Sequence, residues 1–301
     1  MPPFKRQLHV TALQTLLTCG HRFYLRHVKA IHRPKSPNLA IGSVTHDASA
    51  SNLIHKIANA KLMPEDEVLD HARDGIKFEI GEGEGLSDDG LRPIDKKRQA
   101  EIVDETIAFS RVHYNEVAPK TNPAIIEQDV NGRTLELPSV EWPYVLDMRH
   151  WPFNIAGKID LLDLNSDGEF DIHDTKTTRR KPADDVAEAN IQMTPYSMAV
   201  HYILDQPYPI RSSLDFLVIG RKKLGDEAMY RKTERSAAHE NIFLRIFERA
   251  VKTIEAGLFL PADPGHFATP CKNCEYRHGD CVFYRDPSTI GSEYLKPKET
   301  G

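Results

Sequence analysis

The four cysteines of the chain are the first residues whose spacing points to chemistry. Three fall within eleven positions late in the sequence and one stands near the start: Cys271, Cys274, Cys281 and Cys19. A C-x-x-C pair can place two thiolates on one metal ion or cluster, and cytosolic thiols are rarely paired in disulfides. Tetrahedral zinc and a 4Fe-4S cluster both fit this ligand set, with a simple thiol pair and a buried Cys19 as the third alternative. If all four hold one centre, it joins positions 252 residues apart and clasps the two ends of the chain.

A second group lies in residues 157–178, whose sequence predicts two strands joined by a tight turn. Residues 166–168, Ser-Asp-Gly, can form a three-residue turn with the glycine in the left-handed conformation. That register places Asp160 opposite Asp174, and Lys176 shares the face of Asp174 because strand side chains alternate. Two carboxylates and a lysine are therefore expected to converge at one place. The plainer alternative is that these residues form a solvent-exposed cross-strand ion pair with no catalytic role. A one-residue change in the turn would separate them.

The neighbours of these three residues are apolar, among them Ile159, Leu161 and Ile172. Carboxylates in such surroundings are costly unless a cation compensates their charge. Mg²⁺ and Mn²⁺ prefer oxygen ligands and keep several waters, so two carboxylates and a main-chain carbonyl would suit either ion. Such an ion fits phosphate chemistry, in which a nearby lysine can position water and neutralise developing charge.

The composition is that of a globular protein. Of 301 residues, 40% are hydrophobic and 28% are charged, which excludes collagen-like and wholly disordered chains. The net charge of −5 argues against a protein that coats nucleic acid by overall positive charge, although basic residues gather locally at 179–181. The first ten residues lack the apolar stretch of a signal peptide, and no segment approaches the roughly 18 apolar residues of a membrane span. We therefore expect a cytoplasmic protein.

Helical patterns occupy the first 118 residues and return later. Apolar spacing predicts a helix over residues 9–30, interrupted at Cys19 and Gly20. Pro34 and Pro37 are expected to end this helix, and Ser43 is expected to cap the next one. Residues 81–92 form a Gly-rich acidic loop. Further helices are expected from Pro64, over about 93–117, over about 184–204 and over about 236–256.

Strand composition begins at Pro123, where a sheet is expected to start. The predicted strands are AIIEQDV, RTLELPSV, YVLDM, FNIAGKIDLLDL, EFDIHDTKTT, SLDFLVIG and AMYRK. Strands with helices before and after them in the sequence predict a mixed α/β core with a helical insertion.

In this order, the motifs resemble those of the PD-(D/E)XK nuclease superfamily, specifically its iron-sulfur RecB-like branch of CRISPR-associated four-cysteine exonucleases and AddB-type nuclease domains. The matching landmarks run from residue 8 to residue 284: LQTLLTCGHRFYLRHV with one early cysteine, AIGSVTHDASA with His46, AIIEQDV with Glu127, GKIDLLDL with Asp160, FDIHDTKTT with the Asp-x-Lys strand, Gln192 and Tyr196 as a Gln-x-x-x-Tyr pair, and three late cysteines. Each landmark alone is weak, but the ordered set is specific.

The resemblance implies a role for each of these residues. His46, Asp160, Asp174 and the main-chain carbonyl of Thr175 would hold Mg²⁺ or Mn²⁺, with Glu127 supporting the site and Lys176 as the catalytic lysine. Gln192 and Tyr196 would position DNA, although Pro195 inside their helix could rotate one of them away. The resemblance favours 4Fe-4S over zinc at the four cysteines. By position after the hairpin, Arg179, Arg180 and Lys181 would contact the DNA backbone.

The resemblance also implies a restriction-endonuclease-like fold, a mixed sheet flanked by helices, in three parts. Residues 1–40 and 258–301 would form the iron-sulfur clasp, and 41–257 the nuclease core with a helical insertion at about 61–120. The expected function is a metal-dependent DNA exonuclease that acts on single strands or duplex ends in recombination, repair or CRISPR-type processing, with a recombination, helicase or integrase protein as a possible partner. A catalytically silent iron-sulfur DNA-binding or scaffold subunit is the second reading, and a zinc-stabilised protein unrelated to nucleases is the third.

Overall fold

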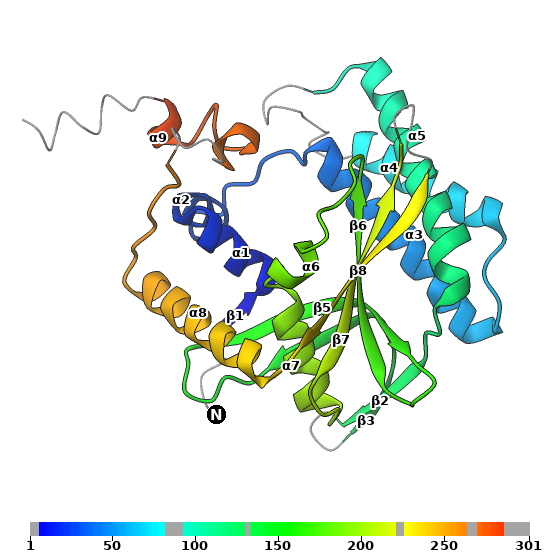
Figure 1. Ribbon diagram of the computed structural model, residues 1–301. Helices are drawn as coiled ribbons and strands as arrows, with labels where there is room; N and C mark the ends of the chain where they lie inside the picture. Colours follow the sequence, from blue (N-terminus) through cyan, green and yellow to red (C-terminus); the bar gives the residue numbers. More distant parts are fainter. Residues whose placement is uncertain (1–5, 82–92, 130–132, 221–225, 264–269, 286–301) are drawn as a thin grey trace, which may run out of the picture.

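A mixed β-sheet forms the centre of the computed structural model, which describes residues 6–81, 93–129, 133–220, 226–263 and 270–285 (Figure 1). Its strands pair in the order β1-β5-β6-β7-β8, with β4 also paired to β5. β1 is parallel to β5 and β6 is parallel to β7, whereas the other pairs are antiparallel. The strand bounds are β1 Arg6–His9, β4 Val140–Leu146, β5 Phe153–Leu164, β6 Phe170–Thr178, β7 Ile210–Val218 and β8 Glu227–Arg235.

The first two predicted strands lie outside this sheet. β2 (Ile125–Asp129) and β3 (Thr134–Pro138) form a separate two-stranded antiparallel sheet. A single bridge between Pro123 and Asp163 links the segment before β2 to the main sheet. The expectation that one sheet starts at Pro123 was therefore wrong for these two strands.

Helices cover both faces of the main sheet (Figure 1). On one face lie α3 (Pro37–Asn59), α4 (Glu65–Gly81) and α5 (Lys96–Val112), and on the other lie α1 (Val10–Thr18), α7 (Met193–Ile203) and α8 (Ala237–Glu255). β7 joins the two layers, because Leu217 packs with Ile41 of α3 whereas Leu214 packs with Phe243 of α8. The remaining turns are α2 Gly20–Phe23, the π-helical η1 Tyr24–Val28 and η2 His113–Val117, η3 Ala118–Lys120, α6 Val186–Ala189, η4 Pro270–Asn273 and α9 Val282–Arg285.

The segment predicted as a helical insertion, about 61–120, is largely helical over its described residues. α4 begins directly after Pro64, as expected, and α5 begins at Lys96 with the Asp95 side chain accepting a hydrogen bond from the N–H of Arg98. Residues 82–92, most of the predicted Gly-rich loop, lie outside the described residues. Within the described part of the chain, no helix combines the length and apolar character that crossing a membrane requires.

Two helix boundaries differ from expectation. Ser43 lies inside α3, which instead begins at Pro37 with the Ser36 side chain accepting a hydrogen bond from the N–H of Leu39. Proline favours the first turn of a helix because its missing N–H would have no partner there, so Pro37 opens this helix rather than ending the previous one. The expected break at Cys19 is confirmed, because that residue is extended (φ −159°) between α1 and α2.

The C-terminal segment packs against the first helices. Glu275 forms an ion pair with Arg22 (2.8 Å) and Asp280 forms one with Arg33 (2.6 Å). The hydroxyl of Tyr276, a buried residue, donates a hydrogen bond to the carbonyl of Ile31. The two ends of the described chain are thus joined by side-chain contacts of their own, apart from any metal centre.

Candidate active site and cysteine pocket

The hairpin of β5 and β6 has the register that its turn predicts. Gly168 is left-handed (φ 81°), and the N–H of Asn165 donates to the carbonyl of Glu169 at 2.9 Å. The last paired residues on the open side are Leu161 and His173, so Asp160 and Asp174 are next in line on the two strands. The predicted convergence of the two aspartates therefore follows from the turn.

The two strands separate at this point. Beyond His173, β6 pairs with β7 rather than with β5. The Asp160 carboxylate takes over the role of a strand partner, because it accepts a hydrogen bond from the N–H of Thr175 at 2.8 Å. A buried N–H needs a partner, so this contact satisfies β6 and holds the carboxylate between the strands.

Asp160 also contacts α3, through His46. Nδ1 of His46 lies 3.2 Å from a carboxylate oxygen of Asp160. Burial and the nearby Asp174 raise the pKa of Asp160, while His46, Lys176 and the Thr175 N–H lower it, and the net pKa is about 6. A carboxylate with such a pKa is poorly compensated by its own surroundings, as expected for a residue that binds a cation.

Asp174 is fully buried, and its charge is compensated by Lys176. The Lys176 ammonium contacts one carboxylate oxygen, but neither oxygen has a hydrogen-bond partner of good geometry among the described residues. Burial lowers the pKa of Lys176, yet Asp174 and Asp160 together outweigh this effect and raise it. Lys176 therefore remains an ammonium, and the Asp174 oxygen that it does not contact can accept a divalent cation.

Glu141, which the sequence did not indicate, belongs to this group. Ligand atoms of His46, Glu141 and Asp160 all lie within 4.8 Å of one another, a grouping that can hold a metal ion. A second contact fixes Glu141, because its carboxylate lies 2.5 Å from Nζ of Lys158. An imidazole and two carboxylates suit Mn²⁺, and with added waters they suit Mg²⁺.

The backbone of Glu141 explains how β4 delivers this side chain. Glu141 is left-handed (φ 50°), and it is skipped in the otherwise continuous pairing of β4 with β5. Val140 and Trp142 would share a face in a regular strand, yet Val140 packs with Leu53 of α3 and Trp142 packs in the core beneath α7. A non-glycine residue in this conformation is uncommon and is typical of functional sites.

Glu127 does not join the group. It is exposed on β2, directly opposite Glu136 in the two-stranded sheet. This placement corrects the expectation that Glu127 supports the site, because β2 is not a strand of the main sheet. Glu141, two strands later in the chain, is the acidic residue found beside Asp160.

Gln192 and Tyr196 contact each other, but both are buried. The amide of Gln192 donates to the hydroxyl of Tyr196, and these side chains are 9% and 3% exposed. α7 begins at Met193, so Pro195 falls in its first turn, where it is tolerated, and the pair is not separated. Their burial leaves little of either side chain exposed for direct contact with DNA, and their DNA-positioning role stays a prediction.

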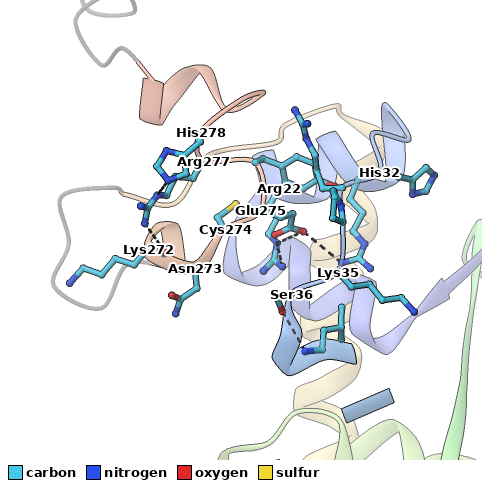
Figure 2. Close-up of a pocket in the computed structure, with 15 residues that line it drawn as sticks. Arg22, His32, Lys35, Ser36, Lys272, Asn273, Cys274, Glu275, Arg277 and His278 are labelled. Atoms are coloured by element: carbon cyan, nitrogen blue, oxygen red, sulfur yellow. Dashed lines mark hydrogen bonds and ion pairs between the residues drawn. The ribbon is translucent and has the colours of Figure 1, made fainter. Parts of the chain in front are cut away.

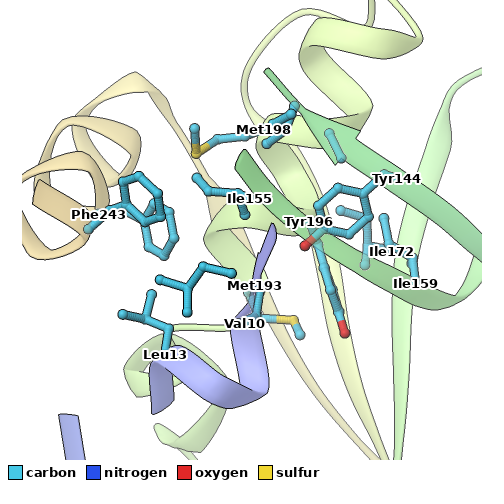
Figure 3. Close-up of a cluster of buried hydrophobic side chains, with 14 of the residues drawn as sticks. Val10, Leu13, Tyr144, Ile155, Ile159, Ile172, Met193, Tyr196, Met198 and Phe243 are labelled. Carbon is cyan, nitrogen blue, oxygen red and sulfur yellow. The ribbon is translucent and has the colours of Figure 1, made fainter. Parts of the chain in front are cut away.

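Tyr196 lies in the apolar core beside Tyr144 (Figure 3). Its ring packs edge-on against Tyr144, with centroids 5.9 Å apart. Gly157 makes room for this stack, because a Cβ there would lie 2.7 Å from the Tyr144 hydroxyl. Burial raises the pKa of Tyr196, and so do the charges of Asp174 and Asp160, which places the hydroxyl in the electrostatic field of the two aspartates.

A buried polar layer lies behind the metal group in the same cavity, lined in part by His113, His173 and Asp215. Nδ1 of His173 lies 2.7 Å from Asp215, whose other oxygen accepts a hydrogen bond from Ser213 at 2.6 Å. Burial, aided by His46, lowers the pKa of His113 to about 4, so this imidazole is neutral at pH 7. The layer supports His46 and Asp160 with groups whose charges are already balanced.

The three basic residues after β6 differ in their environment. Arg179 is engaged, with contacts from its guanidinium to both carboxylate oxygens of Glu105 and to Oδ1 of Asn38 (3.0 Å). Arg180 and Lys181 are exposed. Of the three, Arg180 and Lys181 therefore present charge to solvent, and Arg179 ties the end of β6 to α5.

The four cysteines line one largely apolar pocket together with Leu25, Phe283 and Tyr284: Cys19, Cys271, Cys274 and Cys281. The Cys19 sulfur accepts hydrogen bonds from the N–H groups of Arg22 (3.4 Å) and Ala262 (3.3 Å). Burial raises the pKa of Cys274 to about 11. Burial also raises the pKa of Cys281, and the nearby Cys19 and Cys271 raise it further. A metal centre would reverse these shifts, and this donor set fits either zinc or an iron-sulfur cluster.

The comparisons with known proteins bear on the whole chain. No curated protein matched it. A solved structure titled "Crystal structure of SSO0001" aligns over 88% of this chain and 92% of that chain at 11% identity, with a TM-score of 0.29 that carries no argument. The model of the PD-(D/E)XK nuclease superfamily matches residues 7–278, which include the hairpin, α3 and three of the cysteines. The chain therefore belongs to the PD-(D/E)XK nuclease superfamily, a group of metal-dependent nucleases.

Proposed function

We propose that this protein is a metal-dependent DNA exonuclease that acts on single strands or duplex ends. The observation that carries the proposal is the junction of β5 and β6, where His46, Asp160 and the Asp174–Lys176 pair meet. A scaffold protein would have no need of a buried carboxylate with unsatisfied oxygens beside a lysine. This arrangement favours the enzyme over a catalytically silent subunit.

The metal would be held by His46, Glu141, Asp160 and Asp174, with the Thr175 carbonyl as expected from the motif. When bound, the ion would polarise the scissile phosphate and lower the pKa of an attacking water. Lys176 stays protonated, so it stabilises negative charge on the phosphate rather than accepting a proton. The Thr175 N–H keeps the Asp160 carboxylate oriented, and Gln192 with Tyr196 closes the core beneath Asp174.

The four cysteines would hold a 4Fe-4S cluster, which places the chain in the iron-sulfur branch of the superfamily. The shared pocket, its apolar lining and the N–H groups directed at Cys19 support this proposal. The cluster would then join residues 1–40 to residues 258–301 around the core at 41–257. Absorbance near 400 nm and iron content after anaerobic purification test the cluster, and zinc in place of iron would contradict it.

DNA processing in recombination, repair or CRISPR-type systems would be the setting of this activity, in the cytoplasm and with a helicase, integrase or recombination protein as partner. The decisive assay uses end-labelled single-stranded and duplex DNA with Mg²⁺, Mn²⁺ or EDTA. Stepwise shortening from an end, present with either metal and abolished by EDTA, is the expected result. Cleavage of closed circular DNA at the same rate would contradict the exonuclease assignment, and no cleavage of any substrate would contradict the nuclease.

A further inference from the structure

We propose that the basic pocket between the loop before α3 and the cysteine-bearing segment is a second phosphate-binding subsite, which holds the DNA strand within about four nucleotides of the catalytic centre. This inference rests on the proposed function and specifies where the substrate runs. Its residues come from both ends of the chain (Figure 2). Lys272, Arg277 and His278 lie on one side of the pocket, and Arg22, His32 and Lys35 lie on the other.

The pocket carries an excess of positive charge. Of the described residues that line it, six are lysines or arginines and one is acidic: Arg22, Arg26, Arg33, Lys35, Lys272 and Arg277, with Glu275. Asp280 and Glu79 neutralise two cations at the rim, through Arg33 and Lys35. Six cations against three carboxylates leave about three positive charges uncompensated, in a protein whose net charge is −5. Such a local excess favours a polyanion.

The ion pairs also fix the geometry of the pocket. Glu275 contacts both Arg22 (2.8 Å) and Arg26 (3.8 Å), which orients the two guanidinium groups side by side. Arg26 remains 44% exposed, so it has hydrogen-bond donors to offer a ligand. A planar guanidinium with free donors is well suited to phosphate oxygens.

α3 sets the distance between this pocket and the catalytic centre. Ser36 and Leu39 at the start of α3 line the pocket, and His46 on the same helix belongs to the metal group. Ten residues of α-helix at about 1.5 Å each place the two sites about 15 Å apart. Neighbouring phosphates of one strand are at least the duplex rise of about 3.4 Å apart, so this distance corresponds to at most about four nucleotides.

The surface between the two sites is hollowed and carries further charge. A second pocket along the same half of α3 is lined by Asn38 and Ile41 together with the end of β6, residues 177–180. The first turn of α3 contains no acidic residue that would repel a phosphate. A strand can therefore pass from the catalytic centre along α3 and into the basic pocket.

The test compares two double variants of the full-length protein that remove the same charge. Arg26→Gln/Lys272→Gln alters the pocket, whereas Arg245→Gln/Lys252→Gln alters exposed residues of α8 as a control. Binding of single-stranded DNA of about 4 and about 12 nucleotides is measured by fluorescence anisotropy with Ca²⁺, at salt concentrations from about 50 to 200 mM. Iron content and melting temperature are recorded for every variant.

We expect the pocket variant to flatten the slope of log affinity against log salt by about 1.4 for the longer DNA, since each lost contact removes about 0.7. Its affinity deficit relative to wild type should then shrink about sevenfold between 50 and 200 mM salt. The control variant should match wild type, and all three proteins should bind the short DNA alike.

Equal slopes for the pocket and control variants would overturn the inference while leaving a wild-type nuclease intact. A wild-type protein that neither binds nor cuts DNA would overturn both the inference and the proposed function. If the double variant loses iron or melts early, Arg26→Gln alone decides the matter, because Arg26 lies on η1 whereas Lys272 lies between the two cysteines of the C-x-x-C pair. Its expected change in slope is about 0.7, and no change contradicts the subsite.

Discussion

The carboxylate of Asp160 accepts a hydrogen bond from the backbone N–H of Thr175 at the point where β5 and β6 stop pairing. This contact holds a functional side chain in a gap of the sheet, between α3 on one face and α7 on the other. A metal at Asp160 would therefore lie close to both the His46 side and the Asp174 side of β6. The geometry of the site depends on the strand separation as much as on the acidic residues themselves.

Replacement of Lys176 by alanine should abolish cleavage and leave Mn²⁺ binding largely intact. Lys176 supplies charge to the reacting phosphate, so its loss should affect the chemical step. Asp174→Ala should lose both cleavage and Mn²⁺ binding, because it removes a metal ligand and leaves the charge of the Lys176 ammonium uncompensated. Single-turnover cleavage and calorimetric Mn²⁺ titration measure the two effects, with Lys252→Ala as the control. Cleavage by Lys176→Ala at the wild-type rate would show that this strand is not catalytic.

Glu141→Gln should weaken Mn²⁺ binding by at least about 10- to 100-fold, the range found when a residue that only supports a metal's ligands is replaced. Glu127→Gln should bind like wild type, since Glu127 is exposed on the separate β2–β3 sheet. The two substitutions are chemically identical, so each serves as the control for the other. Weaker binding by Glu127→Gln alone would restore the assignment made from its motif.

The contrast between these two glutamates shows what the sequence can predict. The hairpin register follows from three consecutive residues, 166–168, because a tight turn with a left-handed glycine permits one pairing. From that register the meeting of Asp160 and Asp174 could be predicted. Glu141 could not, because its position depends on a left-handed backbone and on the pairing of β4 with β5 some twenty residues later. No local pattern encodes either feature.

The start of α3 could have been predicted from the sequence. Ser36 followed by Pro37 is a capping residue with proline at the first helical position, a recognised signal for a helix start. The burial of Gln192 and Tyr196 was harder to predict. Helical spacing shows that the two residues share one face of a helix, but it does not show which other parts of the protein cover that face. The pairing of β2 with β3 alone likewise depends on contacts that strand composition does not specify.

The contribution of Asp160 to the stability of the metal-free protein should fall as pH rises from about 4 to about 6, whereas the contribution of His113, whose pKa is lowered to about 4, should rise over the same range. The pKa of Asp160 is raised by burial to about 6, so the folded state binds the proton more tightly than the unfolded state over this range. A shift of about two units corresponds to up to about 3 kcal/mol. Urea unfolding in EDTA at several pH values measures the effect, with Asp160→Asn as the reference that removes this titration. Parallel pH profiles for the two proteins would show that Asp160 titrates normally.

Addition of Mn²⁺ should reverse that trend, because the ion competes with the proton for Asp160. Its stabilising effect should grow as pH rises through about 6. The shift in melting temperature caused by Mn²⁺, measured between pH 5 and 7.5, reports this competition. His113 titrates in the wild-type protein and in Asp160→Asn alike, so the difference between the two proteins removes the contribution of His113 to the pH dependence.

Cys19→Ala should lose the chromophore near 400 nm and lower the free energy of unfolding. In the chain-entropy model, a link between positions 252 residues apart restrains the unfolded chain by about 5 kcal/mol. The ion pairs of Glu275 and Asp280 would remain, so the segments should stay in contact but with less stability. Thr18→Ala, an exposed neighbour, is the control. Unchanged iron content and melting temperature in Cys19→Ala would show that Cys19 is not a ligand.

Arg179 should behave differently from the two residues that follow it. Arg180→Ala/Lys181→Ala removes exposed charge next to the catalytic strand, so it should flatten the salt dependence of single-strand binding by about 1.4 with little loss of stability. Arg179→Ala breaks the paired contact with Glu105 and the hydrogen bond to Asn38, so it should lower the free energy of unfolding by about 1 kcal/mol. Anisotropy at several salt concentrations and urea unfolding separate the two effects. An unaltered slope in Arg180→Ala/Lys181→Ala would place the DNA on another face of the protein.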